Sequence, residues 1–530
     1  MSLLLIVLPL VTSLMLWLPM DVLAKRMIAI VGSSLTFIAA LVLPATRVDV
    51  RWLPGLEAYF SIDSSGAART LILVAALMVI PTTVVAGQVL ERHKGTFLAL
   101  LLLMQASLNG LFLAKDLVLY YIFWEATLIP SIIMLGVWGG EKRREAALKY
   151  LVYAVTSSFL MLIAILALRP LSGAASYRLA DLLVATPQLA PSVQISLFLG
   201  FAVAFAVKVP LMPLHMWLPD FHEQNHPSGV ADVAGTLYKV GAWGFFAWAL
   251  PLLPAAAASL SPLMMTLAAI TALYAAIIAT AQTNLKRFLA YASLSHMGIA
   301  GVGVFALNAT GLSGAMYLIA AQMASTGGLF LIAGMLYARR GSFEMDDYGG
   351  LAKSAPTLAA ISMFVLFASI GVPGLSNFPG EFMSLMGAYQ AFPVLGVVAT
   401  LAVIAAGVYG VNMFQRVYQG QETTPVNDVS LFEVLVLVPV VGGILWLGIA
   451  PSPQLAQIDA QARLGAQRLS VPVHGEVVPE NELLPEPSTV PDTAPEETPA
   501  PVPEEDIRER MPDTLASTSW SNLQNLVGGN

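Results

Sequence analysis

Residues Phe205–Trp243 read FAVKVPLMPLHMWLPDFHEQNHPSGVADVAGTLYKVGAW, and this stretch decides how the whole chain is interpreted. Lys208 follows a long apolar run and precedes Pro210 and Pro213, while Lys239 lies inside the next apolar run. A charge at the centre of a bilayer is costly, so an intramembrane lysine indicates a function. Prolines beside it indicate a broken helix, which membranes tolerate only where protein or a water-filled cavity satisfies the backbone. The alternative is a loop lysine that reaches up to the headgroups, but apolar residues flank both lysines on each side.

The composition of the 530-residue chain is that of an integral membrane protein. Hydrophobic residues make up 57% and charged residues 11%, and the mean hydropathy is +0.75, whereas soluble domains carry roughly a quarter charged residues. Cysteine is absent, which excludes iron–sulfur clusters, thiolate metal sites and disulfides on this chain. The sequence contains no GxGxxG motif and no Walker loop, so it shows no nucleotide site. We expect no resident cofactor or metal and no nucleic-acid partner.

Apolar runs of about 20 residues, the length that crosses a bilayer, predict an all-α polytopic fold. The first run lacks a basic flank and a cleavage site and is interpreted as a retained span rather than a signal peptide. The run at 384–414 is over-long for one straight span and is expected to be tilted or kinked. About fourteen spans are predicted, at 3–19, 27–44, 70–90, 96–114, 117–138, 149–168, 195–216, 229–250, 262–282, 288–306, 312–337, 357–377, 384–414 and 430–450.

The loops between these spans differ in their basic residues. Loops after odd-numbered spans hold 14 Lys and Arg, including Lys286 and Arg287, against 6 in loops after even-numbered spans. Basic residues favour the cytoplasmic side. We therefore expect the odd-numbered loops in the cytoplasm and both termini outside it, in the inner (plasma) membrane of a bacterial cell.

Two of the predicted spans are interrupted by proline and glycine. They are the seventh, KVPLMPLHMWLP at 208–219, and the twelfth, IGVPGLSNFPG at 370–380, each accompanied by a titratable residue, Lys208 or Glu381. Broken helices at corresponding places in two halves indicate an inverted-repeat transporter with its ion path near mid-membrane. Spans 4–8 and 9–13 are the expected repeats. The expected domains are three N-terminal spans (1–95), a first repeat (96–250), a second, inverted repeat (262–414), a last span (430–450) and a tail (451–530).

The tail changes character along its length. Residues 454–470 place Leu455, Ile458, Ala462 and Leu469 near one helical face, which predicts a short amphipathic helix on the outer membrane surface. From Val471 onward the sequence is rich in proline and carries 12 Asp and Glu against 2 Arg. Such a segment buries too little apolar surface to fold alone, so disorder is expected.

The remaining ionisable residues of the spans suit proton transfer. Glu125, Asp232, His296 and Glu381 all lie in apolar runs, where they can face the bundle interior and pair with one another. A nearby carboxylate changes the proton affinity of a buried lysine, and histidine relays protons near neutral pH. The alternative is a structural ion pair, but desolvation makes buried pairs poor stabilisers.

Six motifs follow one another along the chain: YYIFWEATLIPSIIMLGVWG, EKRREAALKYLVY, AFAVKVPLMPLHMWLPDFH, GTLYKVGAWG, AQTNLKRFLAYASLSHMG and GLSNFPGEF. In this order they resemble the antiporter-like subunits of respiratory complex I, the proton-pumping NADH:quinone oxidoreductase. The resemblance covers roughly residues 70–450. Because Glu381 stands where related subunits usually carry lysine, the chain is most similar to the subunit M (chain 4) branch.

The resemblance implies a role for each matching residue. Glu125 and Lys208 would form a pair that modulates the pump, Lys239 would be the central proton carrier, His296 would belong to the connecting relay, and Glu381 would be the exit-side carrier. Gln322 stands where the branch commonly has a second relay histidine, and glutamine cannot take a proton. The loop DFHEQNHPSG also departs from the usual LPDAHxEAPT form.

The resemblance further implies that redox chemistry takes place elsewhere in a larger assembly. FMN, iron–sulfur clusters and quinone are expected on partner subunits, and neighbouring antiporter-like subunits are the expected contacts within the bilayer. Two alternatives stay open. One is an ion/proton exchange subunit of a multisubunit antiporter or membrane-bound hydrogenase, and the other is a non-transporting bundle whose charges only brace the helices.

Overall fold

The computed structural model describes residues 2–90, 92–236, 239–421 and 424–470, and this part of the chain is almost entirely helical. The prediction of an all-α polytopic fold is confirmed. Two shorter apolar helices, α1 (Ser2–Met15) and α17 (Pro356–Ser369), accompany the long ones. Eleven described helices are long and apolar enough to cross a membrane: α2 (Val22–Val42), α3 (Ala67–Val89), α4 (Lys94–Leu113), α5 (Leu117–Trp138), α6 (Arg143–Ser172), α8 (Pro191–Lys208), α13 (Pro254–Thr280), α14 (Leu285–Phe305), α15 (Ala309–Arg340), α19 (Pro393–Tyr418) and α20 (Leu431–Ile449).

The remaining helices and helical turns lie between the long helices or follow them. Residues 245–249 form a π-helical turn, η3 (Phe245–Ala249), inside the segment that follows Lys239. The others are α7 (Leu179–Ala185), α9 (Leu218–Gln224), α10 (Val230–Thr236), α11 (Val240–Gly244), α12 (Leu250–Leu252), α16 (Leu351–Ser354), α18 (Asn377–Ala391), α21 (Ser452–Ser470) and the 3₁₀ turns η1 (Pro54–Leu56), η2 (Thr186–Gln188) and η4 (Met345–Asp347).

Helix boundaries differ from the predicted spans where proline intervenes. The predicted span at 384–414 was wrong, because α18 ends at Ala391 and Pro393 begins α19. Proline is favoured at the first helical position, where its missing N–H costs nothing. In contrast, Pro262 lies inside α13, so this helix begins earlier than the predicted residue 262.

A proline inside a helix leaves a carbonyl without its usual donor, and in two helices a side chain from elsewhere replaces that donor. Pro9 in α1 removes the N–H that would bond to Leu5, and the Asn109 side-chain amide donates to the Leu5 carbonyl at 2.7 Å. Pro170 in α6 does the same to Leu166, whose carbonyl accepts from the Tyr177 hydroxyl at 3.4 Å. These contacts keep proline-bearing helices compatible with an apolar environment.

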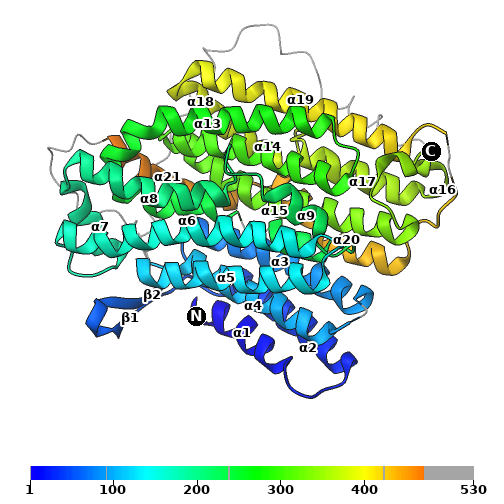
Figure 1. Ribbon diagram of the computed structural model, residues 1–530, viewed down its shortest axis with the longest axis horizontal. Helices are drawn as coiled ribbons and strands as arrows, with labels where there is room; N and C mark the ends of the chain where they lie inside the picture. The colour runs from blue at the N-terminus through cyan, green and yellow to red at the C-terminus, as the bar shows by residue number, and fades with distance from the viewer. Residues whose placement is uncertain (1, 91, 237–238, 422–423, 471–530) are drawn as a thin grey trace, which may run out of the picture. The chain divides into compact units, whose positions relative to one another are not determined.

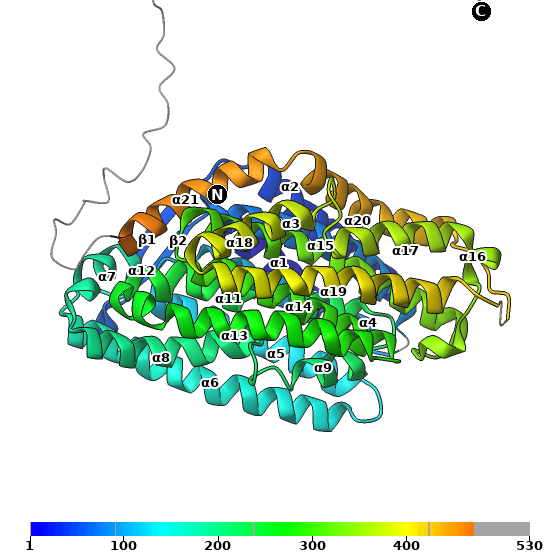
Figure 2. The same ribbon diagram turned by 90° about the horizontal axis from the view of Figure 1, so that it is seen from above.

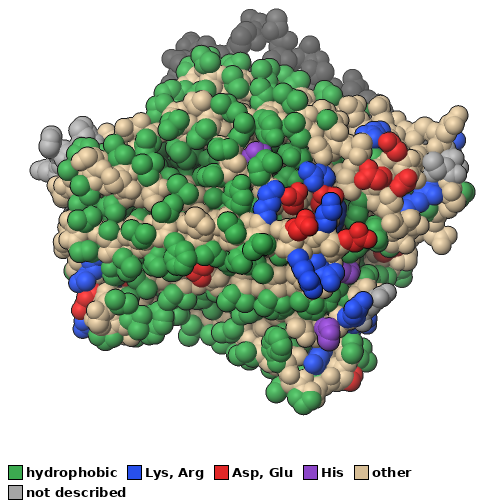
Figure 3. Space-filling model, viewed as in Figure 1, with side chains coloured by type: hydrophobic (Ala, Val, Ile, Leu, Met, Phe, Trp, Pro, Cys, Tyr) green, Lys and Arg blue, Asp and Glu red, His purple; other side chains and the backbone are tan. Residues whose placement is uncertain are grey.

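The central helices are α14 and α15, which are buried along their whole hydrophobic windows. α13 packs on α14, and α15 packs on α18. Figures 1 and 2 show α6, α8 and α13 lying side by side as neighbouring long ribbons, with α19 next to α13. Peripheral helices such as α2, α6 and α19 keep large exposed apolar side chains, and apolar groups cover much of the face drawn in Figure 3. Such surfaces suit lipid or other membrane helices.

A β-hairpin interrupts the helical pattern and was not predicted. β1 (Arg47–Leu53) and β2 (Ala58–Asp63) pair in antiparallel register from Arg47 opposite Asp63, with η1 at the turn. The alternation RVDVRWL before Pro-Gly is a signal for a strand and a turn. Hydropathy over a span-length window does not detect elements of six or seven residues.

The helix predicted at 454–470 is present as α21. Its apolar face does not lie free, because Ile458 and Ala462 are fully buried and α21 packs on α15 and α3. The Asp459 carboxylate accepts a hydrogen bond from Ser313 of α15 at 2.5 Å. The protein itself therefore covers the face that was expected to rest on the membrane surface. The predicted acidic tail from Val471 lies outside the described residues.

Candidate functional site

The first helix break lies between α8 and α9, at residues 209–217. Pro210 stops α8 one residue after its C-cap, and the interruption leaves backbone groups without helical partners. The Trp217 indole donates to the Val207 carbonyl at 3.0 Å, and the Met212 N–H donates to Thr271 of α13 at 2.9 Å. The predicted break in the seventh span is therefore present, and protein side chains satisfy its backbone as the apolar setting requires.

Lys208 is the last residue of α8 and is only 5% exposed. Its ammonium group donates to the Tyr150 hydroxyl of α6 at 2.8 Å. The same ammonium lies 5.1 Å from the Tyr150 ring centre and 5.7 Å from that of Trp124, within the range of cation–π attraction. Trp124 precedes Glu125 on α5, so Lys208 lies near the helix that carries its predicted partner. Glu125 itself is half-buried, and the Glu125–Lys208 pair stays a prediction.

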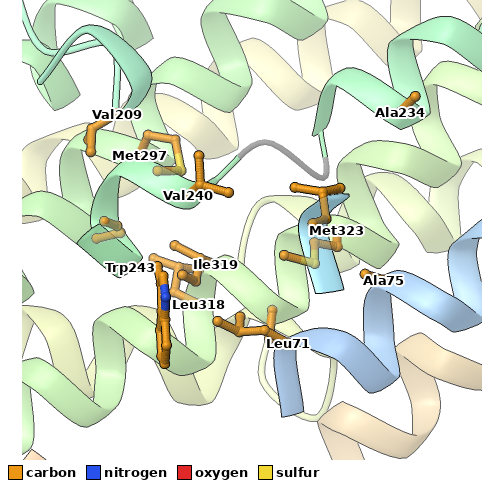
Figure 4. Close-up of a cluster of buried hydrophobic side chains, with 14 of the residues drawn as sticks. Leu71, Ala75, Val209, Ala234, Val240, Trp243, Met297, Leu318, Ile319 and Met323 are labelled. Carbon is orange, nitrogen blue, oxygen red and sulfur yellow. The ribbon is translucent and has the colours of Figure 1, made fainter. Parts of the chain in front are cut away.

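Lys239 is buried and immediately precedes Val240, the first residue of α11. Its ammonium group hydrogen-bonds to the side-chain carbonyl oxygen of Gln322, which is fully buried on α15. The structure thus brings the predicted central carrier into contact with the residue that replaces the usual relay histidine. Figure 4 shows apolar side chains of α3, α10, α11, α14 and α15, including Val240 and Trp243, gathered in this region.

The second helix break separates α17 from α18, at residues 370–376. Gly371 has φ +76°, a left-handed conformation that glycine adopts without a steric penalty. A Cβ on Gly371 would come within 2.0 Å of a Glu381 carboxylate oxygen, so the glycine also makes room for this side chain. The Asn377 side-chain amide donates to the Ser369 carbonyl at 3.0 Å and so joins the two half-helices. The predicted break in the twelfth span is present.

His296 and Glu381 are in direct contact. Nδ1 of His296, on α14, lies 2.9 Å from the Glu381 carboxylate, and Nε2 lies 3.1 Å from the Tyr409 hydroxyl of α19. His296 is fully buried and Glu381 is 3% exposed. The relay histidine and the exit-side carboxylate that the resemblance implied are therefore neighbours, and the Tyr409 hydroxyl contacts the other ring nitrogen of the histidine.

Two further histidines lie at the first break and were not selected from the sequence. His215 is 3% exposed, and its ring lies 5.3 Å from that of Tyr274. His222 of α9 contacts Asp232 of α10 through Nδ1 at 3.0 Å. The sequence could have pointed to both histidines, because they lie in the proline-rich stretch that follows the intramembrane Lys208.

Lys286 corrects the sequence interpretation. It was counted with the cytoplasmic loops, but it is the second residue of α14, is fully buried, and forms an ion pair with Asp232 at 2.7 Å. Asp232 was identified only as an ionisable residue in an apolar run, and the structure places it against His222, Asn225 and Lys286. The sequence around Asp232 does not show that its ion-pair partner comes from another helix.

The titratable groups lie on helices that pack on one another. α8 packs on α11, α11 packs on α15, and α15 packs on α14 and α18. Side chains of these types can accept and release protons, or can hold water by hydrogen bonds. Buried acid–base groups on contiguous helices provide the chemistry for moving protons through an apolar interior.

Comparison with known proteins is consistent with this geometry. A family model described as the transmembrane region of NADH:quinone oxidoreductase and Mrp antiporters matches residues 114–406, more than half of the chain. The chain belongs to this family of antiporter-like membrane subunits, and it is a multi-pass membrane protein.

Individual relatives show which members of this family the chain resembles. NADH-quinone oxidoreductase subunit 13 of Thermus thermophilus is 44% identical over 76% of this chain and 86% of its own length. Subunit M of the Escherichia coli K12 enzyme is 35% identical over 80% and 86%. A chain of respiratory complex I from Thermus thermophilus with bound NADH superposes with a TM-score of 0.85 at 41% identity, covering 89% of this chain and 100% of that one.

More distant structures share the fold. A chain of the Mrp complex from Dietzia superposes with a TM-score of 0.76 at 19% identity, covering 91% of this chain and 54% of its own. The chain is therefore more similar to the complex I relatives than to the Mrp chain, and the protein is a membrane subunit of an NADH-quinone oxidoreductase.

Proposed function

We propose that Glu125, Lys208, Lys239, His296 and Glu381 carry protons through this subunit while partner subunits transfer electrons from NADH to quinone. The observation that carries this proposal is the placement of Lys239 and Glu381. Lys239 is buried against Gln322, and Glu381 is buried against His296 at the second helix break. Burying an ionisable side chain in an apolar interior costs free energy, so residues of this kind favour a role in transport.

Gln322 lies at the middle of the proposed proton path, between Lys239 and His296. Its carbonyl oxygen contacts Lys239, and its amide nitrogen is buried without a hydrogen bond to any described residue. Buried polar groups of this kind are usually satisfied by water. A proton moving from Lys239 towards His296 would therefore pass along water held by Gln322, because the amide itself cannot be protonated.

The rest of the assembly would supply the redox chemistry. FMN, iron–sulfur clusters and quinone would be bound by partner subunits, and neighbouring antiporter-like subunits would contact the exposed apolar helices of this one. We place the protein in the bacterial plasma membrane with both termini outside the cytoplasm, as the distribution of Lys and Arg indicates. The family match also names Mrp antiporters, but the Mrp chain resembles this one at only 19% identity, and no observation favours cation exchange.

Replacement of Lys239 by alanine tests the proposal. In assembled complex in membrane vesicles, Lys239→Ala should abolish or sharply reduce proton pumping driven by NADH oxidation. Proton pumping and NADH oxidation would be measured together, and the amount of assembled complex would be checked by native gel. Lys353→Ala, at an exposed lysine of α16, is the matched control and should pump normally. Normal pumping by the assembled Lys239→Ala complex would refute the proposed role.

A further inference from the structure

A cavity of about 600 Å³ lies where the turn between α3 and α4 meets the ends of α5 and α15. The turn between α9 and α10 completes its wall with His226 and Ser228. No described residue that lines the cavity is acidic, whereas Arg92, His93 and Arg143 all line it. The cavity is separate from the relay residues, and the charge of its lining favours an anionic ligand.

The two arginines are held in place from their backbone side. The Trp138 indole, at the end of α5, donates to the Arg92 carbonyl at 2.9 Å and so fastens the α3–α4 turn to α5. Nη1 of Arg143 donates to the Gly139 carbonyl at 3.1 Å, while its Nε and Nη2 donate to no described residue. The Arg143 guanidinium therefore has N–H groups available for a further acceptor.

These arginines differ from basic residues of other turns on the predicted cytoplasmic side. Arg287 of α14, Arg339 of α15 and Arg416 of α19 each form an ion pair, at 2.6, 2.8 and 2.6 Å. Among the residues that the structure describes, neither Arg92 nor Arg143 has a carboxylate partner. An anion from outside the chain would supply the missing charge.

Further basic residues lie beside the same turn. Lys25 and Arg26 of α2 pack against glycines of α4 and α3, where an added Cβ would come within 2.6 and 2.9 Å of them. Nε of Arg26 is buried without a hydrogen bond to a described residue. Residues 21–26, 91–94 and 141–145 together carry seven Lys and Arg against four Asp and Glu, so the excess of positive charge belongs to the whole region. Figure 3 shows basic and histidine side chains near the ends of α2 and α4.

One wall of the cavity is apolar. Val89 of α3 and Val137 of α5 both line it, and they are 43% and 51% exposed. Trp138 beside them packs edge-on against Phe97, with ring centres 5.3 Å apart. Tryptophan is typical of the boundary between headgroups and hydrocarbon. A ligand with a negative head and an apolar body matches this lining better than a soluble anion or an acidic side chain of a partner subunit does.

We propose that the cavity binds the headgroup of an anionic phospholipid of the cytoplasmic leaflet, with Arg92 and Arg143 on its phosphate and its acyl chains along Val89 and Val137. Basic pockets between spanning helices on the cytoplasmic side bind such headgroups, and arginine can bond phosphate through two parallel N–H groups. The bound lipid would join the ends of α3, α5 and α15. The choice of leaflet rests on the orientation proposed above, and the site is independent of the proton route.

Photo-crosslinking of the assembled complex tests this site. The complex would be reconstituted in phosphatidylcholine vesicles that contain phosphatidylglycerol with a diazirine near the headgroup end of one acyl chain. Labelled peptides of this subunit would be identified by mass spectrometry. R92Q/R143Q should lower the labelling of α3 by about tenfold or more, because two charges that attract the headgroup are lost. K142Q/R144Q is the matched control, since it removes the same charge from the same turn at residues that do not line the cavity, and it should label like the wild type.

Equal labelling of the two double variants would overturn the proposal. High labelling in both would mean that the arginines do not bind the lipid, and low labelling in both would mean only diffuse attraction to a basic surface. Excess unlabelled phosphatidylglycerol should compete, whereas equal competition by phosphatidylcholine or by inorganic phosphate would contradict recognition of an anionic lipid. An unlabelled wild-type subunit would show that another subunit covers the cavity, which also overturns the proposal.

A variant without a change of charge covers failure of R92Q/R143Q to assemble. Val137→Trp adds bulk at an exposed apolar position of the cavity wall and should reduce the labelling of α3. Val408→Trp on α19 is its control, because Val408 is 52% exposed and does not line the cavity, and it should keep wild-type labelling. Unchanged labelling of α3 in Val137→Trp would contradict binding in this cavity.

Discussion

At the scale of single residues, Gly371 determines where the Glu381 carboxylate can lie. The glycine combines a left-handed backbone with a Cβ position only 2.0 Å from a Glu381 oxygen. A side chain here would be strained by about 1–2 kcal/mol from its backbone conformation alone. It would also push Glu381 away from His296, so we expect Gly371 to matter for folding and for the proposed proton transfer.

Gly371→Ala should therefore reduce proton pumping per NADH and lower the amount of assembled complex. Gly374→Ala is the matched control, because Gly374 has φ +88° but no atom within 4 Å of its Cβ position. The control shares the backbone strain and lacks the clash. Pumping per NADH in the assembled fraction is the measurement, and an equal loss in both variants would show that the contact with Glu381 is unimportant.

His226 makes stability depend on pH. It lies in the turn between α9 and α10, outside the spanning helices, and burial together with the charge of Lys286 lowers its pKa from 6.5 to about 4. The folded protein thus binds fewer protons at this residue than the unfolded chain between these pH values. The associated stability is present above about pH 6.5 and is lost as pH falls towards 4, by about 2 kcal/mol at pH 5.

His226→Asn should lose less thermal stability than the wild type when the pH is lowered from 7 to 5. Asparagine can still accept from the Ser228 N–H, which now donates to His226 Nδ1 at 3.2 Å. Thermal unfolding of the purified complex at both pH values gives the comparison. The same acid-induced loss in both proteins would contradict the assignment to His226.

The sequence was most informative about ionisable residues that lie in apolar runs. Lys208, Lys239 and Glu381 stand out because charges are rare in apolar runs, and all three are buried as expected. The partners were harder to predict. Lys286 begins α14 beside polar residues and so looks like a loop residue, while its partner Asp232 comes from a different helix. Pairing of this kind depends on packing between helices.

At the scale of helices, Asn109 of α4 supplies a hydrogen bond that a proline removes from α1. Its amide donates to the Leu5 carbonyl that Pro9 leaves unbonded. Asn109→Leu should destabilise the packing of α1 on α4 by about 1–3 kcal/mol, because a buried carbonyl loses its donor. Gln105→Leu is the matched control one turn earlier on α4, since neither atom of the Gln105 amide bonds to a described residue.

The half-life of the complex in detergent at raised temperature would measure this difference. It should shorten for Asn109→Leu and change little, or lengthen, for Gln105→Leu. Similar half-lives for the two variants would mean that the Leu5 carbonyl finds another donor.

Helices and helix breaks were predictable where one sequence pattern, such as proline with glycine or apolar periodicity, was clear. Both helix breaks were anticipated from proline and glycine, and α21 from its apolar periodicity. The division between α18 and α19 was missed because apolar residues continue across it and only Pro393 marks the start of a helix. The β-hairpin was missed because a charged, alternating segment has no signal in a hydropathy scan.

At the scale of the whole molecule, the chain lacks cysteine, which makes its orientation directly measurable. Ser65 follows β2 and Gln421 follows α19, and both are exposed. The bias of Lys and Arg predicts that these positions lie on opposite sides of the membrane, with Ser65 outside and Gln421 in the cytoplasm.

In intact cells, a membrane-impermeant maleimide should label this subunit in Ser65→Cys and leave it unlabelled in Gln421→Cys. Inside-out vesicles should give the reverse. Cysteines of other subunits do not interfere when the labelled bands are separated by size. Labelling of both positions from the same side would refute the predicted topology.

In the proposed relay, the contact of His296 with Glu381 and Tyr409 would affect the timing of each transport cycle. When Glu381 is ionised it only accepts, so Nδ1 of His296 carries the hydrogen and Nε2 accepts from the Tyr409 hydroxyl. Once a proton enters at Nε2 and leaves from Nδ1, the hydrogens sit on the wrong atoms for the next one. The imidazole must exchange its hydrogen back between the two nitrogens before it can serve again, which makes this recovery a separate step that can limit turnover.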